Sequence, residues 1–102
     1  MKAELENIPL VDNTTGSRFE LTVDHYTGFI TYRLQGDKIY LLHTEVPEQL
    51  SGKGAGAALV EKTLRYIEAH HLKLIPYCPF VIAYLKRHPE WQRLLDAGTK
   101  IP

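Results

Sequence analysis

Polar and apolar residues alternate in two neighbouring stretches in the first third of the chain. In residues 18–24, the apolar positions are Phe19, Leu21 and Val23, and polar residues separate them. A period of two is typical of a half-buried strand. The alternation resumes over residues 26–35, after a tight turn near Asp24. We therefore predict two antiparallel strands that follow one another along the chain.

A third strand is predicted over residues 38–46, after a turn signal at Gly36-Asp37, where glycine supplies the positive φ of a tight hairpin. Its apolar residues fall on both faces: Ile39, Tyr40, Leu41, Leu42 and Val46. Such a strand is expected inside a sheet that is covered on both sides. The first twelve residues show no clear period, so the first half of the chain is predicted to be an antiparallel meander.

The hydrophobic period changes to that of a helix in the second half. Apolar residues recur at Val60, Leu64 and Ile67, which predicts a helix over residues 57–71 that carries His70 and His71 in its last turn. Residues 72–77 form a short apolar run that we predict as a strand. A helix between two strands implies a parallel pair with a right-handed crossover.

The chain is predicted to end in helical segments. A proline at residue 79 favours a helix start, so a short helix is expected over residues 79–86. One or two further helical turns are expected over residues 90–97. Together with the meander and the parallel pair, these elements predict an α/β (α+β) fold with helices on the faces of the sheet.

Composition limits the class of protein. The chain has 102 residues, 44% hydrophobic and 24% charged, which is ordinary for one soluble domain that spans residues 1–102, with a core of about residues 18–95. No stretch approaches the roughly 20 apolar residues of a membrane helix, and the start does not resemble a secretory signal. We therefore expect no membrane association.

Charge and cysteine content narrow the class further. Twelve basic residues balance 12 acidic ones, so a nucleic-acid partner is not expected. Cys78 is the single cysteine, which excludes an internal disulfide and a four-cysteine zinc site and favours a reducing, cytoplasmic setting. No His-x-x-x-His pair occurs, so we expect no metal site.

The strongest chemical signal is the sequence Gly52-Lys53-Gly54-Ala55-Gly56 between the third strand and the first long helix. Free N–H groups and the dipole of a helix N-terminus favour an anion, and a phosphate or pyrophosphate is the natural occupant. The alternative is that the glycines only make a tight connection. The loop is not a Walker A motif, and no acidic residue lies in residues 72–75 to hold the ribose of a nicotinamide cofactor.

These residues resemble a known pattern. Gln49-Leu50-Ser51-Gly52-Lys53-Gly54 matches Gln/Arg-x-x-Gly-x-Gly/Ala, the CoA pyrophosphate loop of the GNAT (GCN5-related) acetyltransferases. The order of predicted elements also looks like the GNAT core. A small single-domain GNAT-like family is still more similar, over roughly residues 18–95. Its further motifs match His43, Thr44, Val46 and Pro47, then Ile75, Pro76 and Cys78, and finally Pro89 and Trp91.

The resemblance implies acetyl-CoA as the cosubstrate, an unidentified amine as the acceptor, and acetyl transfer as the reaction. It places the pyrophosphate on the loop, with candidate binding residues Val46, Gln49, Gly52, Lys53, Gly54, Ala55 and Gly56. It also places the pantetheine arm between two parallel strands that part. Pro47 and Pro76 suggest independently that the strands part at their carboxyl ends, where open α/β sheets bind ligands.

Four residues are candidates for catalysis. Cys78 follows the fourth predicted strand and starts a helix, so it either accepts the acetyl group or lines the thioester pocket. His43 either assists Cys78, acts as general base on an amine, or is a hydrogen-bonded core histidine. Glu45 faces the same side as His43 and is a second candidate base. Tyr84 lies near the position of the GNAT tyrosine that protonates the leaving CoA thiolate, or it is a core aromatic residue.

The sequence departs from the larger GNAT enzymes at one place. Those enzymes carry two helices between the first two strands, and the helices shape the acceptor pocket. Here only the tight turn at residues 24–25 is available, so the acceptor site is expected to be open or to be completed by a partner subunit in a homodimer. A CoA-binding module without catalysis and a protein-interaction domain are the alternative functions.

Overall fold

The computed structural model describes residues 1–101 and contains one five-stranded sheet with the order β1-β2-β3-β4-β5. The strands are β1 (Val11–Asn13), β2 (Arg18–Val23), β3 (Tyr26–Gln35), β4 (Lys38–Glu45) and β5 (Lys73–Pro76). The first four pair antiparallel, and β4 and β5 pair in parallel. The predicted meander with one parallel pair is therefore confirmed.

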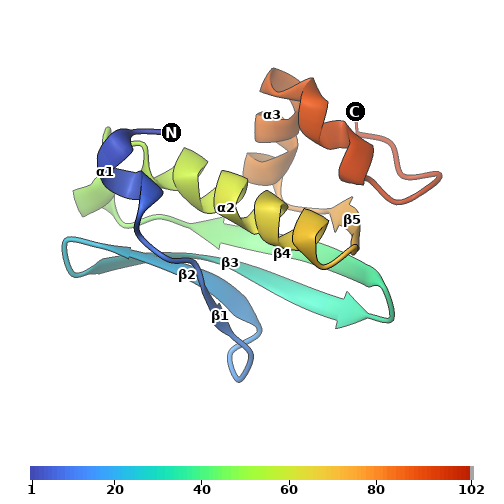
Figure 1. Ribbon diagram of the computed structural model, residues 1–102, viewed down its shortest axis with the longest axis horizontal. Coiled ribbons are helices and arrows are strands. Elements are labelled where there is room, and N and C mark those ends of the chain that lie inside the picture. The colour runs from blue at the N-terminus through green and yellow to red at the C-terminus, as the bar shows by residue number, and fades with distance from the viewer. Residues whose placement is uncertain (102) are drawn as a thin grey trace.

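Helices gather on one face of this sheet (Figure 1). They are α1 (Ala3–Glu6), α2 (Ala55–Ala69) and α3 (Pro79–Arg87), with 3-10 helices at Glu48–Leu50 and Pro89–Leu94. The long helix α2 crosses from β4 to β5, as expected for a parallel pair. Because the helices share one face, the other face of the sheet is left open.

Two predicted turns are confirmed by the strand register. Val23 pairs with Tyr26 around the turn at Asp24 and His25, which have φ angles of 50° and 70°. Gln35 pairs with Lys38 around Gly36, which has a φ of 61°. Positive φ angles match the twist of a two-residue hairpin, so both loops hold their strands in a fixed register.

The core fills the space between the sheet and the helices. Its sheet side comes from alternate residues of the long strands, and its helix side from the inner stripe of α2. These residues are Phe19, Leu21, Ile30, Ile39, Leu41, Leu59, Val60, Leu64 and Ile67, each at most 1% exposed. The alternation and the helical spacing in the sequence predicted this inner face.

The prediction that the third strand is covered on both sides was wrong. This strand is β4, and its partner is β3. Thr31 of β3 pairs with His43, but the next residue, Tyr32, pairs with Leu41. Leu42 is therefore the extra residue of a β-bulge, and it is 41% exposed. The bulge shifts the alternation by one residue. Leu41 and, beyond the bulge, Thr44 share the helix face, while His43 lies on the open face.

The first residues form structure that the sequence pattern did not predict. The short helix α1 buries Leu5, and β1 adds an edge strand beside β2. On β1, the carboxylate of Asp12 accepts hydrogen bonds from the Tyr32 hydroxyl at 2.6 Å and the Tyr66 hydroxyl at 3.2 Å. A strand of three residues is too short to show a period, which is why it escaped prediction.

The helix α2 begins and ends two residues earlier than predicted. His70 and His71 therefore lie beyond its last turn, and His71 adopts a left-handed φ of 55°. The N–H of Leu72 then bonds to the carbonyl of Ile67 at 3.0 Å. A left-handed residue just past the helix end, with such a return bond, is a common way to stop a helix.

Candidate functional site

The predicted anion loop leads directly into the N-terminus of α2. Gly52 and Gly54 both have a φ of 77°, the left-handed region that glycine adopts without strain. The Gly54 carbonyl accepts the first helical hydrogen bond, from the N–H of Ala58 at 3.0 Å. No described side chain caps this end, and its first turn carries no acidic residue. The N–H groups of residues 55–57 are thus available to an anion.

The remaining predicted loop residues lie around this helix end. Gln49 is exposed in the 3-10 helix that precedes the loop, and Ala55 is buried as the first residue of α2. A Cβ atom on Gly56 would lie 2.8 Å from Cζ of Phe80 and 3.5 Å from Cγ2 of Val46. Gly56 therefore leaves room for the Phe80 ring, whether or not a ligand is bound, and a larger residue would displace the exposed end of that ring.

Two lysines flank the loop. Lys53, a predicted phosphate-binding residue, has its ammonium 2.9 Å from a carboxylate oxygen of Asp24. Lys2, which no motif pointed to, donates a hydrogen bond from Nζ to the Gly52 carbonyl at 3.1 Å. Lys2 thus adds a second ammonium group beside the loop, whereas the charge of Lys53 is paired with Asp24.

The strands β4 and β5 part next to this loop. Their pairing ends at Leu41 and Pro76, and the N–H groups of Tyr77 and Cys78 both bond to the Leu41 carbonyl, at 2.9 and 3.1 Å. Within the described residues, β4 continues to Glu45 with no further partner in β5. The pairing thus ends at Pro76, one of the two prolines that suggested it, whereas Pro47 lies beyond the end of β4 and does not face Pro76.

Cys78 lies where the strands part, immediately before α3. Its side chain is 2% exposed, and its Sγ atom is 3.0 Å from Oγ1 of Thr44. His43 is on the opposite face of β4, because the bulge determines which residues of this strand face the helices. The side-chain partner of Cys78 is therefore Thr44, and the suggested contact with His43 is not present.

His43 and Glu45 come together in a hollow on the open face of the sheet. Nε2 of His43 is 3.6 Å from a carboxylate oxygen of Glu45, and both side chains are more than 60% exposed. The hollow has a volume of about 530 Å³ and is lined by Thr27, Phe29, His43, Thr44, Glu45, Val46 and Pro47. An imidazole and a carboxylate in an open hollow can accept a proton from an approaching amine.

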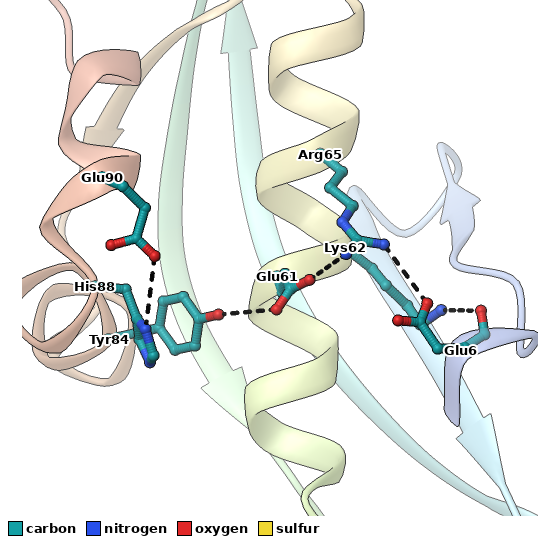
Figure 2. A network of polar contacts seen from close by, with 7 residues as sticks. All are labelled: Glu6, Glu61, Lys62, Arg65, Tyr84, His88 and Glu90. Atoms are coloured by element: carbon teal, nitrogen blue, oxygen red, sulfur yellow. Dashed lines mark hydrogen bonds and ion pairs between the residues drawn. The ribbon is translucent and has the colours of Figure 1, made fainter. Parts of the chain in front are cut away.

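Tyr84 points from α3 toward α2, where its hydroxyl donates a hydrogen bond to Glu61 at 3.3 Å (Figure 2). Glu61 also pairs with Arg65, and the Tyr84 ring lies against His88 with ring centroids 4.3 Å apart. Burial, reinforced by the negative charge of Glu61, raises the pKa of Tyr84 to about 12. Tyr84 thus keeps its proton over the whole neutral range and joins two helices.

The described residues offer no metal centre. Within residues 1–101, no three His, Cys, Asp or Glu side chains gather closely enough to hold a metal ion. None of the helices there is long and apolar enough to cross a membrane.

Comparison with known proteins agrees with the arrangement of the sheet and the helices. The sequence model of the GCN5-related N-acetyl-transferases matches residues 18–94. The chain belongs to this family. The fold of this GCN5-related protein also resembles the NMR solution structure of a GCN5-like candidate N-acetyltransferase from Staphylococcus aureus. The TM-score is 0.65 at 24% sequence identity, over 91% of this chain and 95% of that chain.

Sequence reasoning missed three side-chain contacts around the candidate site of this GCN5-related protein. Thr44 was part of a motif, but only the bulge shows that it faces Cys78. Glu61 lies on α2, where nothing in its spacing identifies it as the partner of Tyr84. Lys2 is 50 residues from Gly52 and lies outside the family match, so no sequence signal could have indicated it.

Proposed function

We propose that the protein binds acetyl-CoA and transfers the acetyl group to an amine. Membership of the GCN5-related N-acetyltransferase family supports this reaction class. The observation that carries the proposal is the uncapped N-terminus of α2, next to the point where β4 and β5 part. An anion site beside an opening between strands suits a long cosubstrate that has phosphates in its middle and a thioester at one end.

In this proposal, the N–H groups of residues 55–57 bind the pyrophosphate, and the left-handed φ angles of Gly52 and Gly54 turn the chain into the helix N-terminus that presents them. The pantetheine arm lies along the part of β4 that has no partner in β5. The thioester then lies near Val46, where backbone N–H groups polarise its carbonyl. Cys78 and Thr44 contact each other on the helix side of β4, close to the end of the β4–β5 pairing.

The acceptor amine enters from the hollow on the open face. Its lone pair attacks the thioester carbon, a C–N bond forms, and the C–S bond breaks with release of the CoA thiolate. His43, held near Glu45, takes the proton that the amine loses. Tyr84 retains a proton that it can give to the thiolate, provided that its hydroxyl turns away from Glu61.

A second possible route uses Cys78, which lies at the start of α3. The Cys78 sulfur would bond to the acetyl carbon while the C–S bond to CoA breaks, and the thiol proton would pass to the departing CoA thiolate. The amine would then take the acetyl group from Cys78, and the proton that the amine loses would return to the Cys78 sulfur. We expect direct attack instead, because Cys78 is 2% exposed and its contact is Thr44 rather than a base. Cys78→Ser should keep most of the transfer activity. Loss of turnover, with a one-acetyl mass gain on quenched wild-type protein, would establish the cysteine route.

Thermal melting with and without ligand tests the cosubstrate. Acetyl-CoA at 100 times its Kd should stabilise the protein by about 2.7 kcal/mol, a rise in Tm of roughly 10–20 °C for a domain of this size. NAD and ATP serve as controls and should have no effect. A rise without transfer to any amine would indicate a CoA-binding module, and no rise at all would favour a protein-interaction domain.

A further inference from the structure

Lys2 lies across both left-handed glycines of the loop. Its ammonium donates to the Gly52 carbonyl at 3.1 Å. Its carbon chain passes 3.5–3.8 Å from the position that a Cβ atom on Gly54 would occupy. The side chain thus places a positive charge at the loop from a part of the chain outside residues 18–94, the span that defines the family.

The charge of Lys2 is not compensated within the protein. Among residues 1–101, no carboxylate lies within ion-pair distance of its ammonium, whose hydrogen-bond acceptor is the neutral Gly52 carbonyl. Lys53, the lysine of the loop itself, is paired with Asp24 at 2.9 Å. Lys2 is therefore the better placed of the two lysines to offer its charge to a ligand.

The helix α2 holds Lys2 in place by anchoring α1. Leu5 is buried in the core at 1% exposure. Lys62 donates to the Glu6 carbonyl at 3.0 Å, and Arg65 lies 3.7 Å from the Glu6 carboxylate (Figure 2). The same helix thus supplies the anion-binding N–H groups and fixes the segment that carries the lysine.

We propose that Lys2 is part of the phosphate-binding site and contacts the pyrophosphate of acetyl-CoA. This inference rests on the proposed function. The dipole of α2 supplies only about half a positive charge, whereas a pyrophosphate diester carries two negative charges. Lysine is a compact point charge that suits phosphate, and one bond to Gly52 leaves two ammonium protons for the ligand.

Calorimetric titration of Lys2→Gln with acetyl-CoA tests the proposal. We expect the Kd to rise about tenfold or more, the effect of losing one hydrogen bond to a charged group. Lys86→Gln removes the same charge from an exposed position on α3 and should leave the Kd unchanged. Acetyl-pantetheine lacks the pyrophosphate, so its binding should not respond to Lys2→Gln. Lys2→Arg should keep most of the affinity.

Anchoring by α1 is tested by Leu5→Ala, which should release Lys2 and raise the Kd for acetyl-CoA. The effects of Leu5→Ala and Lys2→Gln should then be non-additive, because both remove the same contact. Where Leu5→Ala does not fold, the salt dependence of binding replaces it. The Kd of the wild-type protein should rise more steeply with salt than that of Lys2→Gln.

The outcomes separate this inference from the proposed function. If wild-type protein binds acetyl-CoA and Lys2→Gln binds it equally well, the role of Lys2 is wrong and the proposed function stands. If Lys2→Gln weakens acetyl-CoA and acetyl-pantetheine to the same extent, Lys2 acts on the fold and the inference is also overturned. If wild-type protein does not bind acetyl-CoA, both fail.

Discussion

At the scale of single residues, Tyr84 combines burial with a raised pKa. It is buried on α3, and its hydrogen bond to Glu61 joins α3 to α2. The pKa of Tyr84 is raised to about 12 by burial first and by Glu61 second. Tyr84 can join the two helices through this hydrogen bond and also keep its proton. The stability of the protein measures the contribution of the hydrogen bond.

Tyr84→Phe should lower the free energy of unfolding by about 1 kcal/mol at neutral pH, which is the typical net contribution of one hydrogen bond to stability. It should also change the response to alkali. Because the folded pKa exceeds the ordinary value of 10.0, the folded protein holds more protons than the unfolded chain between about pH 10 and 12. Stability is therefore complete below this window and falls through it as pH rises.

Urea denaturation across this pH window measures the effect. Tyr84→Phe should show a shallower alkaline loss of stability than the wild-type protein. Part of the loss will remain, because burial and Asp12 also raise the pKa of Tyr32 and Tyr66. Tyr26→Phe, at a tyrosine that is 41% exposed, is the control. An unchanged slope in Tyr84→Phe would show that Tyr84 ionises as easily as in the unfolded chain.

At the scale of elements, the loop before α2 uses its glycines for different reasons. Gly52 and Gly54 take left-handed φ angles, while Gly56 provides room for the Phe80 ring. Gly36, in the turn between β3 and β4, has a similar φ of 61° and no atom within 4 Å of the place where a Cβ would be. It is therefore a matched control for backbone strain away from the site.

Gly54→Ala and Gly36→Ala should each lower the free energy of unfolding by about 1–2 kcal/mol, because a side chain is disfavoured in the left-handed region. Only Gly54→Ala should also weaken binding of acetyl-CoA, since it alters the backbone that leads to residues 55–57. Chemical denaturation and calorimetric titration measure the two effects. Equal loss of affinity in both variants would mean that the loop plays no part in binding.

At the scale of the whole molecule, one-sided packing of the helices places the loop and the open hollow on different faces of the sheet. The loop and α2 lie on the covered face, whereas His43 and Glu45 lie in the hollow on the open face. In the proposed reaction, acetyl-CoA would therefore bind at the loop on the covered face, and the amine would approach from the hollow on the open face.

His43→Gln should lower kcat about a hundredfold, within the usual contribution of a general base, and leave the Kd for acetyl-CoA unchanged. Single-turnover acetyl transfer and calorimetric titration separate these quantities. Glu45→Gln should have a smaller effect, since its carboxylate would act through His43 at 3.6 Å. A rise in Kd without a fall in kcat would place His43 in cosubstrate binding rather than in proton transfer.

The sequence by itself determined the strands and helices of residues 18–94, the two hairpin turns, the parallel pair and the glycine loop. These features depend on residue spacing and on backbone preferences within a few positions, which a linear pattern records. The short β1, with its contact from Asp12 to Tyr32 and Tyr66, shows the limit of such patterns. Three residues carry no period, and their partners lie 20 and 54 positions away.

The tertiary structure alone decided which side chains meet at the proposed site. The bulge at Leu42 turned Thr44 toward Cys78 and His43 away from it. The docking of Leu5 brought Lys2 to Gly52, and the packing of α3 brought Tyr84 to Glu61. Each of these contacts joins elements that are distant in the chain. Local preferences do not specify such contacts, which form when distant apolar faces are buried together.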